Sequence, residues 1–188
     1  MRIDATVCLD EGILEYLVCR PGTFEHETVF TTRCQPAKLH VALLAIGLVP
    51  HPFRPEGFGW WATARQKPRS RVVIEVEWEH EGTTVRRPVG TFLTNRERPD
   101  GVAATHWIFT GSAFFKHEGK NHYAADHTGV TIGIIPEGCG VVQFGERAGI
   151  PYQGEDQGLE INTETVPRVG TKVKLIFTPH RKGADEAE

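Results

Sequence analysis

Hydrophobic and polar residues alternate along several stretches of this chain, which is the pattern of strands that bury one face. The clearest stretch begins at Arg71, where Val72, Ile74, Val76 and Trp78 alternate with Val73 and three glutamates. A last strand is expected over 172–177, where lysines alternate with apolar residues. These two segments predict sheet surfaces with one wet face and one face in the core.

Shorter segments predict further strands, and turn residues between them predict hairpins. The sequence Asp10-Glu11-Gly12 is expected to close a tight hairpin between 2–9 and 13–19. A turn at His80-Glu81-Gly82 is expected to join the strand that begins at Arg71 to a strand over 83–89, and a further hairpin is expected around 118–121. The strands follow one another through turns and not through crossover helices, so the sheet should be mostly antiparallel. Strands are also expected at 27–32, 83–89 and 130–135.

One helix stands out from this strand-rich pattern. Pro36 is suited to the first turn of a helix, and the segment 36–47 has apolar residues at helical spacing. Its other faces are apolar too, which predicts a helix buried on most sides. The expected fold class is therefore α+β, β-rich, with a mostly antiparallel sheet and one principal buried helix over about 36–47.

The composition narrows the class of protein. The chain has 188 residues, 39% of them hydrophobic, and a formal net charge of -3. Its length suits one domain, expected over 1–178, followed by a disordered polar tail over 179–188. The longest apolar run, 41–49, is about half of what a membrane span needs. The negative charge argues against nucleic acid as a partner.

Four side chains of metal-ligand type mark the first candidate site. Glu25, His26 and Glu27 are consecutive, and His40 lies near the start of the expected helix. Two imidazoles with carboxylates suit a transition metal such as zinc or copper, and a small anionic ligand is the other possibility. The alternative is a solvated loop and a helix histidine that hydrogen-bonds a carboxylate.

Two further segments carry possible binding chemistry. If 118–121 closes a hairpin, His117 and His122 face one another and could share a transition metal or an anion. The proline-rich loop 50–70 is expected to hold neither helix nor strand. Its Trp60 and Trp61 are expected to form a lid over a ligand, or else to pin the loop onto the sheet. His106 and His127 are the other histidines near the hairpin.

Catalytic motifs are missing from the sequence. There is no nucleophile elbow, no Walker A loop, no H-E-x-x-H and no dinucleotide fingerprint. None of the cysteines forms a C-x-x-C pair, and small buried thiols are the expected state. The sequence leaves open whether the protein is an enzyme. The cysteines are Cys8, Cys19, Cys34 and Cys139.

Several segments in a fixed order resemble a known family. They begin with Val7–Cys19 and Gly22–Thr28, and continue with Leu39–Gly47, Trp107–Ser112, Tyr123–Asp126, Asn162–Pro167 and Gly170-Thr171. This set resembles the YdjY-like domain family of bacterial proteins over about 3–178. The resemblance implies an extracytoplasmic protein, periplasmic or secreted, whose export signal has been removed, and it implies no activity. The chain departs from the family pattern at Phe24 and in the glycine-rich segment 136–158.

Three functional hypotheses follow from these observations. The first is an extracytoplasmic binding domain in which Glu25, His26, Glu27 and His40 hold a metal or a small anion. The second is a metal-dependent hydrolase or redox enzyme that uses the same residues with one coordination position open. The third is a protein-interaction module without metal, with an exposed aromatic patch around 58–61. A cytoplasmic location is the alternative to export, since no targeting segment is visible.

Overall fold

The protein is built around a closed barrel of eight strands, with two further small sheets beside it. The computed structural model describes residues 1–54, 60–95, 102, 107–146, 148 and 158–180, apart from the side chains of 61, 62 and 65. Strand accounts for 42% and helix for 18%, so the β-rich class is confirmed. The strands of the barrel are β1 (Arg2–Val7), β3 (Tyr16–Cys19), β4 (Thr28–Thr31), β5 (Arg71–His80), β8 (Trp107–Phe109), β11 (Val130–Gly133), β12 (Val142–Phe144) and β14 (Lys172–Pro179).

The pairing of β14 with both β1 and β5 closes the ring. The order around the barrel is β14-β1-β4-β3-β11-β12-β8-β5, and β5 pairs with β14 again. On that seam the register runs from Lys174 opposite Glu77 to Pro179 opposite Val72. All pairs are antiparallel except β3–β4 and β11–β12, so the mostly antiparallel sheet is confirmed. The sequence alone did not predict closure.

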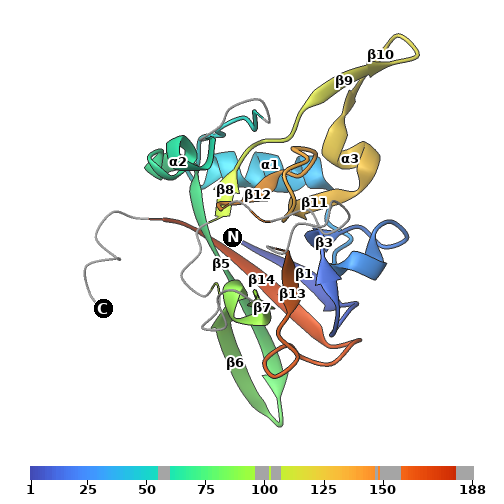
Figure 1. The fold of residues 1–188 in the computed structure, drawn as a ribbon, viewed down its shortest axis with the longest axis vertical. Helices are drawn as coiled ribbons and strands as arrows, with labels where there is room; N and C mark the ends of the chain where they lie inside the picture. The colour runs from blue at the N-terminus through green and yellow to red at the C-terminus, as the bar shows by residue number, and fades with distance from the viewer. Residues whose placement is uncertain (55–59, 96–101, 103–106, 147, 149–157, 181–188) are drawn as a thin grey trace.

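The remaining strands lie outside the ring, as Figure 1 shows. β6 (Thr83–Pro88) forms a hairpin with β5, and β9 (Phe114–His117) forms one with β10 (Lys120–Tyr123) that projects from the body. Both hairpins were predicted. A small sheet joins β2 (Ile13–Leu14), β13 (Leu159–Ile161) and β7 (Leu93–Thr94).

The predicted hairpin around Asp10-Glu11-Gly12 is wrong. β1 pairs with β14 and β4, whereas β2 pairs with β13. The strand at the N-terminus therefore finds both partners far along the chain. Barrel closure gives β1 a neighbour on each edge, which a local hairpin would not do.

The helices differ from expectation in number and in burial. α1 (Pro36–Ala45) confirms the predicted helix, but it buries only one face, with Leu39 and Leu43 in the core. Val41 is 65% and Leu44 45% exposed, so burial on most sides is wrong. The short helices are α2 (Trp60–Arg65) and α3 (Ala124–Thr128), with 3-10 turns η1 (Glu25–Glu27), η2 (Pro68–Ser70) and η3 (Val89–Phe92). α2 and η2 occupy the loop that was expected to be irregular.

The barrel wall has a covered half and an open half. Strands β3, β4, β8, β11 and β12 are buried at every residue, because other segments pack on their outer faces. In β8, for example, Ile108 lies against Trp60 and Ala64 of α2. In β5 and β14, by contrast, inward apolar residues mostly alternate with outward charged ones. Only the open half offers a wet sheet surface to a ligand.

The C-terminal strand runs further than expected. β14 continues to Pro179, and the backbone N–H of His180 donates to the carbonyl of Arg71. His180 is buried, so the first two residues of the expected tail belong to the fold. Residues 181–188 lie outside the described residues.

We expect Phe177→Ala to destabilise the barrel strongly. Phe177 is fully buried on β14, opposite Ile74 on the closing seam. Removing a core phenylalanine costs about 3–5 kcal/mol. Denaturant unfolding should show this loss as a lower midpoint. Thr178→Ala, at the neighbouring exposed position, is the control and should change the free energy of unfolding by less than about 0.5 kcal/mol. Equal effects of the two substitutions would contradict the closing role of this seam.

Candidate functional site

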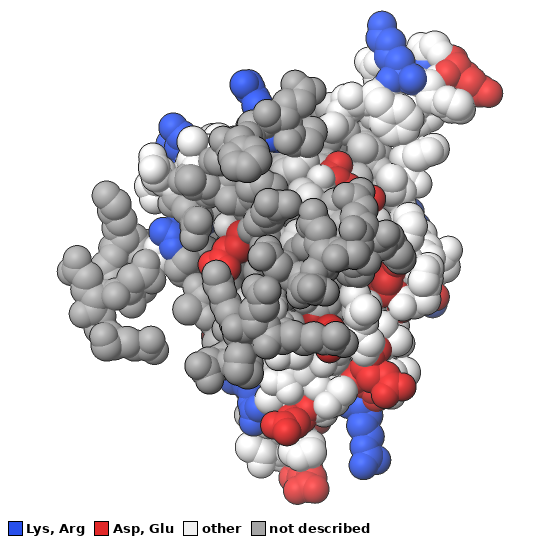
Figure 2. Space-filling model, in the orientation of Figure 1, with Lys and Arg blue, Asp and Glu red and all other residues white. Residues whose placement is uncertain are grey.

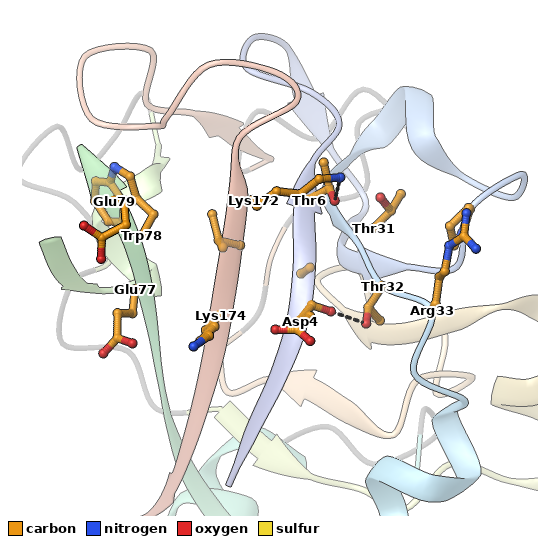
Figure 3. A pocket seen from close by; sticks show the side chains of 13 residues that line it. Asp4, Thr6, Thr31, Thr32, Arg33, Glu77, Trp78, Glu79, Lys172 and Lys174 are labelled. Carbon is orange, nitrogen blue, oxygen red and sulfur yellow. Dashed lines mark hydrogen bonds between the residues drawn. The ribbon is translucent and has the colours of Figure 1, made fainter. Parts of the chain in front are cut away.

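A groove of about 740 Å³ crosses the open half of the barrel wall. It runs over β5, β14 and β1 to the end of β4, and Figure 3 shows its polar side chains above the strands. Alternation along each strand turns these side chains outward, since their neighbours in sequence fill the barrel. The charged residues of the groove are Asp4, Arg33, Glu77, Glu79, Lys172 and Lys174.

Strand register fixes the order of charges across the groove. Lys174 lies opposite Glu77 on one side and opposite Asp4 on the other. Two residues before Lys174 on β14, Lys172 lies opposite Thr6 of β1, and its Nζ donates to the Thr6 hydroxyl at 3.0 Å. The groove therefore alternates in sign from strand to strand, which neutralises the bare sheet surface.

At one end the groove continues into a recess of about 380 Å³. Asp4, Arg33 and Lys174 line both the groove and the recess. Arg2 also lines the recess, and its guanidinium lies 3.5 Å from the Glu77 carboxylate. Within the described part of the chain, Arg33 and Lys174 have no hydrogen bond or ion pair, and neither has the Asp4 carboxylate. Two cations and one carboxylate are thus available to a ligand at this end.

The predicted acidic and histidine run forms the 3-10 turn η1. His26 points to solvent with 76% of its side chain exposed, and its Nε2 lies 3.7 Å from the carboxylate of Glu27. Glu27 is buried and Glu25 is exposed. The turn thus brings His26 beside Glu27 and leaves Glu25 exposed, whereas a shared metal would need all three side chains to converge.

His40 belongs to a different network. Its Nδ1 lies 2.8 Å from the hydroxyl of Tyr123, and that hydroxyl donates to the carbonyl of Gly111 at 2.9 Å. A hydroxyl has one hydrogen, so His40 Nδ1 must carry the proton and donate to Tyr123. The His40 ring also packs edge-on against Phe109. This network fixes α1 against the loop that follows β8.

The four predicted metal ligands are not assembled into a metal site. In the described residues there is no group of three or more His, Cys, Asp or Glu side chains that could hold a metal ion. Glu27 pairs with His26, whereas His40 pairs with Tyr123. Zinc or copper at this set therefore stays a prediction without geometric support.

Trp60 pins its segment to the barrel. Only 4% of Trp60 is exposed, its Nε1 donates to the carbonyl of Pro52 at 3.0 Å, and its ring packs on Phe53. Trp60 therefore adds nothing to an exposed aromatic patch. The side chain of Trp61 and the residue Phe58 lie outside the described residues, so the lid itself stays a prediction.

His51 stacks on Trp60 and is held neutral. The two ring centroids are 5.8 Å apart with an angle of 19° between the planes. Burial lowers the pKa of His51, and the nearby cations Lys67 and Arg54 lower it further. The buried Nε2 has no hydrogen-bond partner among the described residues, which also disfavours a charged ring.

The cysteines and the serine near these networks are not activated nucleophiles. All four cysteines are free thiols, and only Cys19 is fully buried. Burial raises the pKa of Cys8 and of Cys139 to about 12, so both stay protonated at neutral pH. The Ser112 hydroxyl donates to the carbonyl of Cys139 at 2.6 Å and holds a loop in place. Among the residues that the structure describes, no base is positioned to take its proton.

Three segments that carry the family resemblance meet around α1. His40 on α1 hydrogen-bonds the Tyr123 hydroxyl, which in turn donates to the carbonyl of Gly111. Asp126 accepts a hydrogen bond from the backbone N–H of Ala37 at 3.0 Å. Their sequence order therefore reflects one shared structural network. The chain matches the YdjY domain over residues 2–178. It belongs to the YdjY domain family.

The other comparisons give no relative for this YdjY domain. No curated protein and no solved structure matches it. In its described residues, no helix is long and apolar enough to cross a membrane. Function must therefore be inferred from the geometry of the YdjY domain itself.

Sequence reasoning missed the charged groove. A signal was present, since Lys172 and Lys174 alternate with buried residues as Glu77 and Glu79 do. The sequence predicts two wet strand faces from this, but it does not reveal that β14 lies between β5 and β1. Only that pairing brings the two lysines, the two glutamates and Asp4 onto one surface.

We expect Tyr123→Phe to destabilise the fold by about 1–3 kcal/mol, because it leaves His40 Nδ1 and the Gly111 carbonyl without their partner. Denaturant unfolding measures the loss. A double-mutant cycle with His40→Ala should give a positive coupling of at least about 0.5 kcal/mol. Strictly additive effects of the two substitutions would show that the pair does not anchor α1.

We expect His51→Phe to weaken the acid sensitivity of stability. The unfolded chain protonates this histidine near its ordinary pKa of 6.5, whereas the folded ring protonates only at lower pH. The folded state therefore loses stability as pH falls below about 6.5, because the unfolded state binds the proton first. Phenylalanine keeps the stacking on Trp60 and removes this proton. Unfolding free energies measured from pH 7.5 to 5 should fall less steeply for the variant, and identical slopes would contradict the assignment.

Proposed function

We propose that this YdjY domain binds a small organic anion that also carries an amino or hydroxyl group, and that the groove on the open wall is its site. The observation that carries the proposal is the set of Arg33, Lys174 and Asp4, which share one recess and lack partners among the described residues. Binding by an extracytoplasmic protein, as the family resemblance suggests, stays part of the proposal.

The cationic side chains of Arg33 and Lys174 favour an anionic group on the ligand. Arg33 is exposed just after β4, and Lys174 lies on β14 in register with Asp4 of β1. A guanidinium binds a carboxylate or phosphate through two parallel hydrogen bonds, and an ammonium adds a point charge. Arg2 strengthens the positive field of the recess although it already lies near Glu77.

Two carboxylates in the groove favour a ligand that also carries hydrogen-bond donors. Asp4 lies in register beside Lys174, and Glu77 lies on the other side of that lysine. A simple anion would be repelled by these two carboxylates. An amino or hydroxyl group on the same molecule would instead donate to Asp4. The alternation of sign thus favours a ligand that carries both kinds of group.

Binding without catalysis is the simpler reading of this lining. The described residues around the groove include no histidine, and burial raises the pKa of the Cys34 thiol in the recess. Neither an imidazole base nor a reactive thiolate is therefore offered to the ligand by these residues. The hydrolase or redox alternative and the interaction-module alternative stay predictions, and no contact in the described residues favours them.

We expect Lys174→Gln and Arg33→Gln each to weaken ligand binding by about 10- to 100-fold, since each removes one charge-assisted hydrogen bond. Isothermal titration calorimetry at low salt, with phosphate, acetate, glycine and larger amino acids as probes, gives their dissociation constants and so identifies the preferred probe. A molecule with both an amino and an acidic group should bind more tightly than either simple ion.

The matched control is Lys116→Gln, which removes an exposed lysine on the β9–β10 hairpin, outside the groove. It should leave affinity unchanged. Asp4→Asn should reduce the preference for amino-bearing probes while it keeps or improves the binding of simple anions. A probe that binds equally well to the parent protein and to both cation variants would refute the groove as the site.

A further inference from the structure

A cluster of aromatic and histidine rings lies on the projecting β9–β10 hairpin, separate from the groove. His122 stacks on Phe115 with ring centroids 5.5 Å apart and an angle of 24° between the planes. His127 of α3 packs edge-on against the same Phe115 at 5.1 Å and lies 5.7 Å from His122. His117 lies 6.0 Å from His122 on its other side.

Hairpin register and the helix that follows produce this cluster. Phe115 lies directly opposite His122, so His117 is the diagonal neighbour of His122 on the same face. α3 begins immediately after β10 and brings His127 back over Phe115. The prediction that His117 and His122 face one another directly is wrong, because His122 lies opposite Phe115 and His117 lies opposite Lys120. The closer histidine neighbour of His122 is His127.

We propose that His122 and His127 form a surface site for a divalent transition metal, with water completing the coordination. Imidazole is a strong ligand for copper, nickel and zinc. Metal–nitrogen bonds of about 2.0 Å place the centroids of two imidazoles on one ion roughly 5–6 Å apart. The observed 5.7 Å between the ring centroids of His122 and His127 falls within this range.

The surroundings of the pair are compatible with a bound cation. His127 is exposed and His122 is partly exposed, so an ion has access. Phe115 packs on both rings and limits their rotation, which lowers the entropy lost when the metal binds. Charged neighbours of both signs flank the cluster, with Lys116, Glu118 and Lys120 on the hairpin and Asp126 on α3. Figure 2 shows both signs side by side at the projecting end of the hairpin.

The site is bidentate and not a three-residue centre. The described residues contain no group of three such ligands that could hold one metal ion. Two imidazoles with water give moderate affinity and a site that exchanges with solvent. Because it lies on another element, this proposal does not depend on the anion groove.

The test is titration of the untagged full chain with Cu²⁺, followed by calorimetry and by electron paramagnetic resonance. One equivalent should bind with a spectrum that shows two coordinated nitrogens. His122→Ala and His127→Ala should each weaken binding by at least about tenfold, as the loss of a direct ligand requires. Phe115→Leu should weaken binding by a smaller factor while it keeps the two-nitrogen spectrum.

The control is His26→Ala, which removes an exposed histidine on η1 and should leave Cu²⁺ binding unchanged. His117→Ala should change affinity less than His127→Ala does. Binding that survives the double substitution of His122 and His127 would overturn the proposal, as would a larger loss in His117→Ala than in His127→Ala. NMR spectra of each variant, compared with the parent, establish that the hairpin remains folded.

Discussion

The pairing of β14 with β5 on one side and β1 on the other is the interaction on which this structure depends. β14 is the last strand in the sequence, and it completes a ring whose other seven strands all precede it in the chain. Closure satisfies the backbone of both neighbouring strands and leaves the barrel no open edge. It also encloses Phe177 and Leu175 in the core, so hydrogen bonding and apolar burial depend on the same contact.

Closure divides the wall into two halves with different roles. On the covered half, α2 packs on β8. Tyr16 of β3, Val130 of β11 and Ile135 form another small apolar cluster. α1 is fixed over the barrel by apolar contacts of Leu39 and by the bond between His40 and Tyr123. The open half mostly keeps the alternation of apolar and charged residues, and it bears the charged groove. A ligand site on a sheet surface is possible there because nothing else in the described chain covers it.

Polar residues serve two distinct purposes in this YdjY domain. Tyr123, Ser112 and Asp126 are committed to backbone groups, and they hold loops and helices at fixed positions. Lys174 lies on β14 and Arg33 follows β4, and neither side chain has a partner in the described residues. Groups that are already satisfied stabilise the fold, whereas groups that are positioned and unsatisfied can bind a ligand.

The sequence by itself determined the local features of this protein. Alternation predicted β5 and β14, turn residues predicted the β5–β6 and β9–β10 hairpins, and Pro36 marked the start of α1. The ordered motifs indicated the YdjY family. These features follow from periodicity and turn chemistry, which act over a few residues.

Only the tertiary structure decided which distant segments pair. It separated His40 from Glu25, His26 and Glu27, because the helix residue turns to Tyr123 while the others form a surface turn. It placed β14 between β5 and β1, and so brought Lys174, Glu77 and Asp4 together from opposite ends of the chain. A residue's spacing in sequence carries no information on such contacts, because strand partners are chosen by burial and by closure of the sheet as a whole.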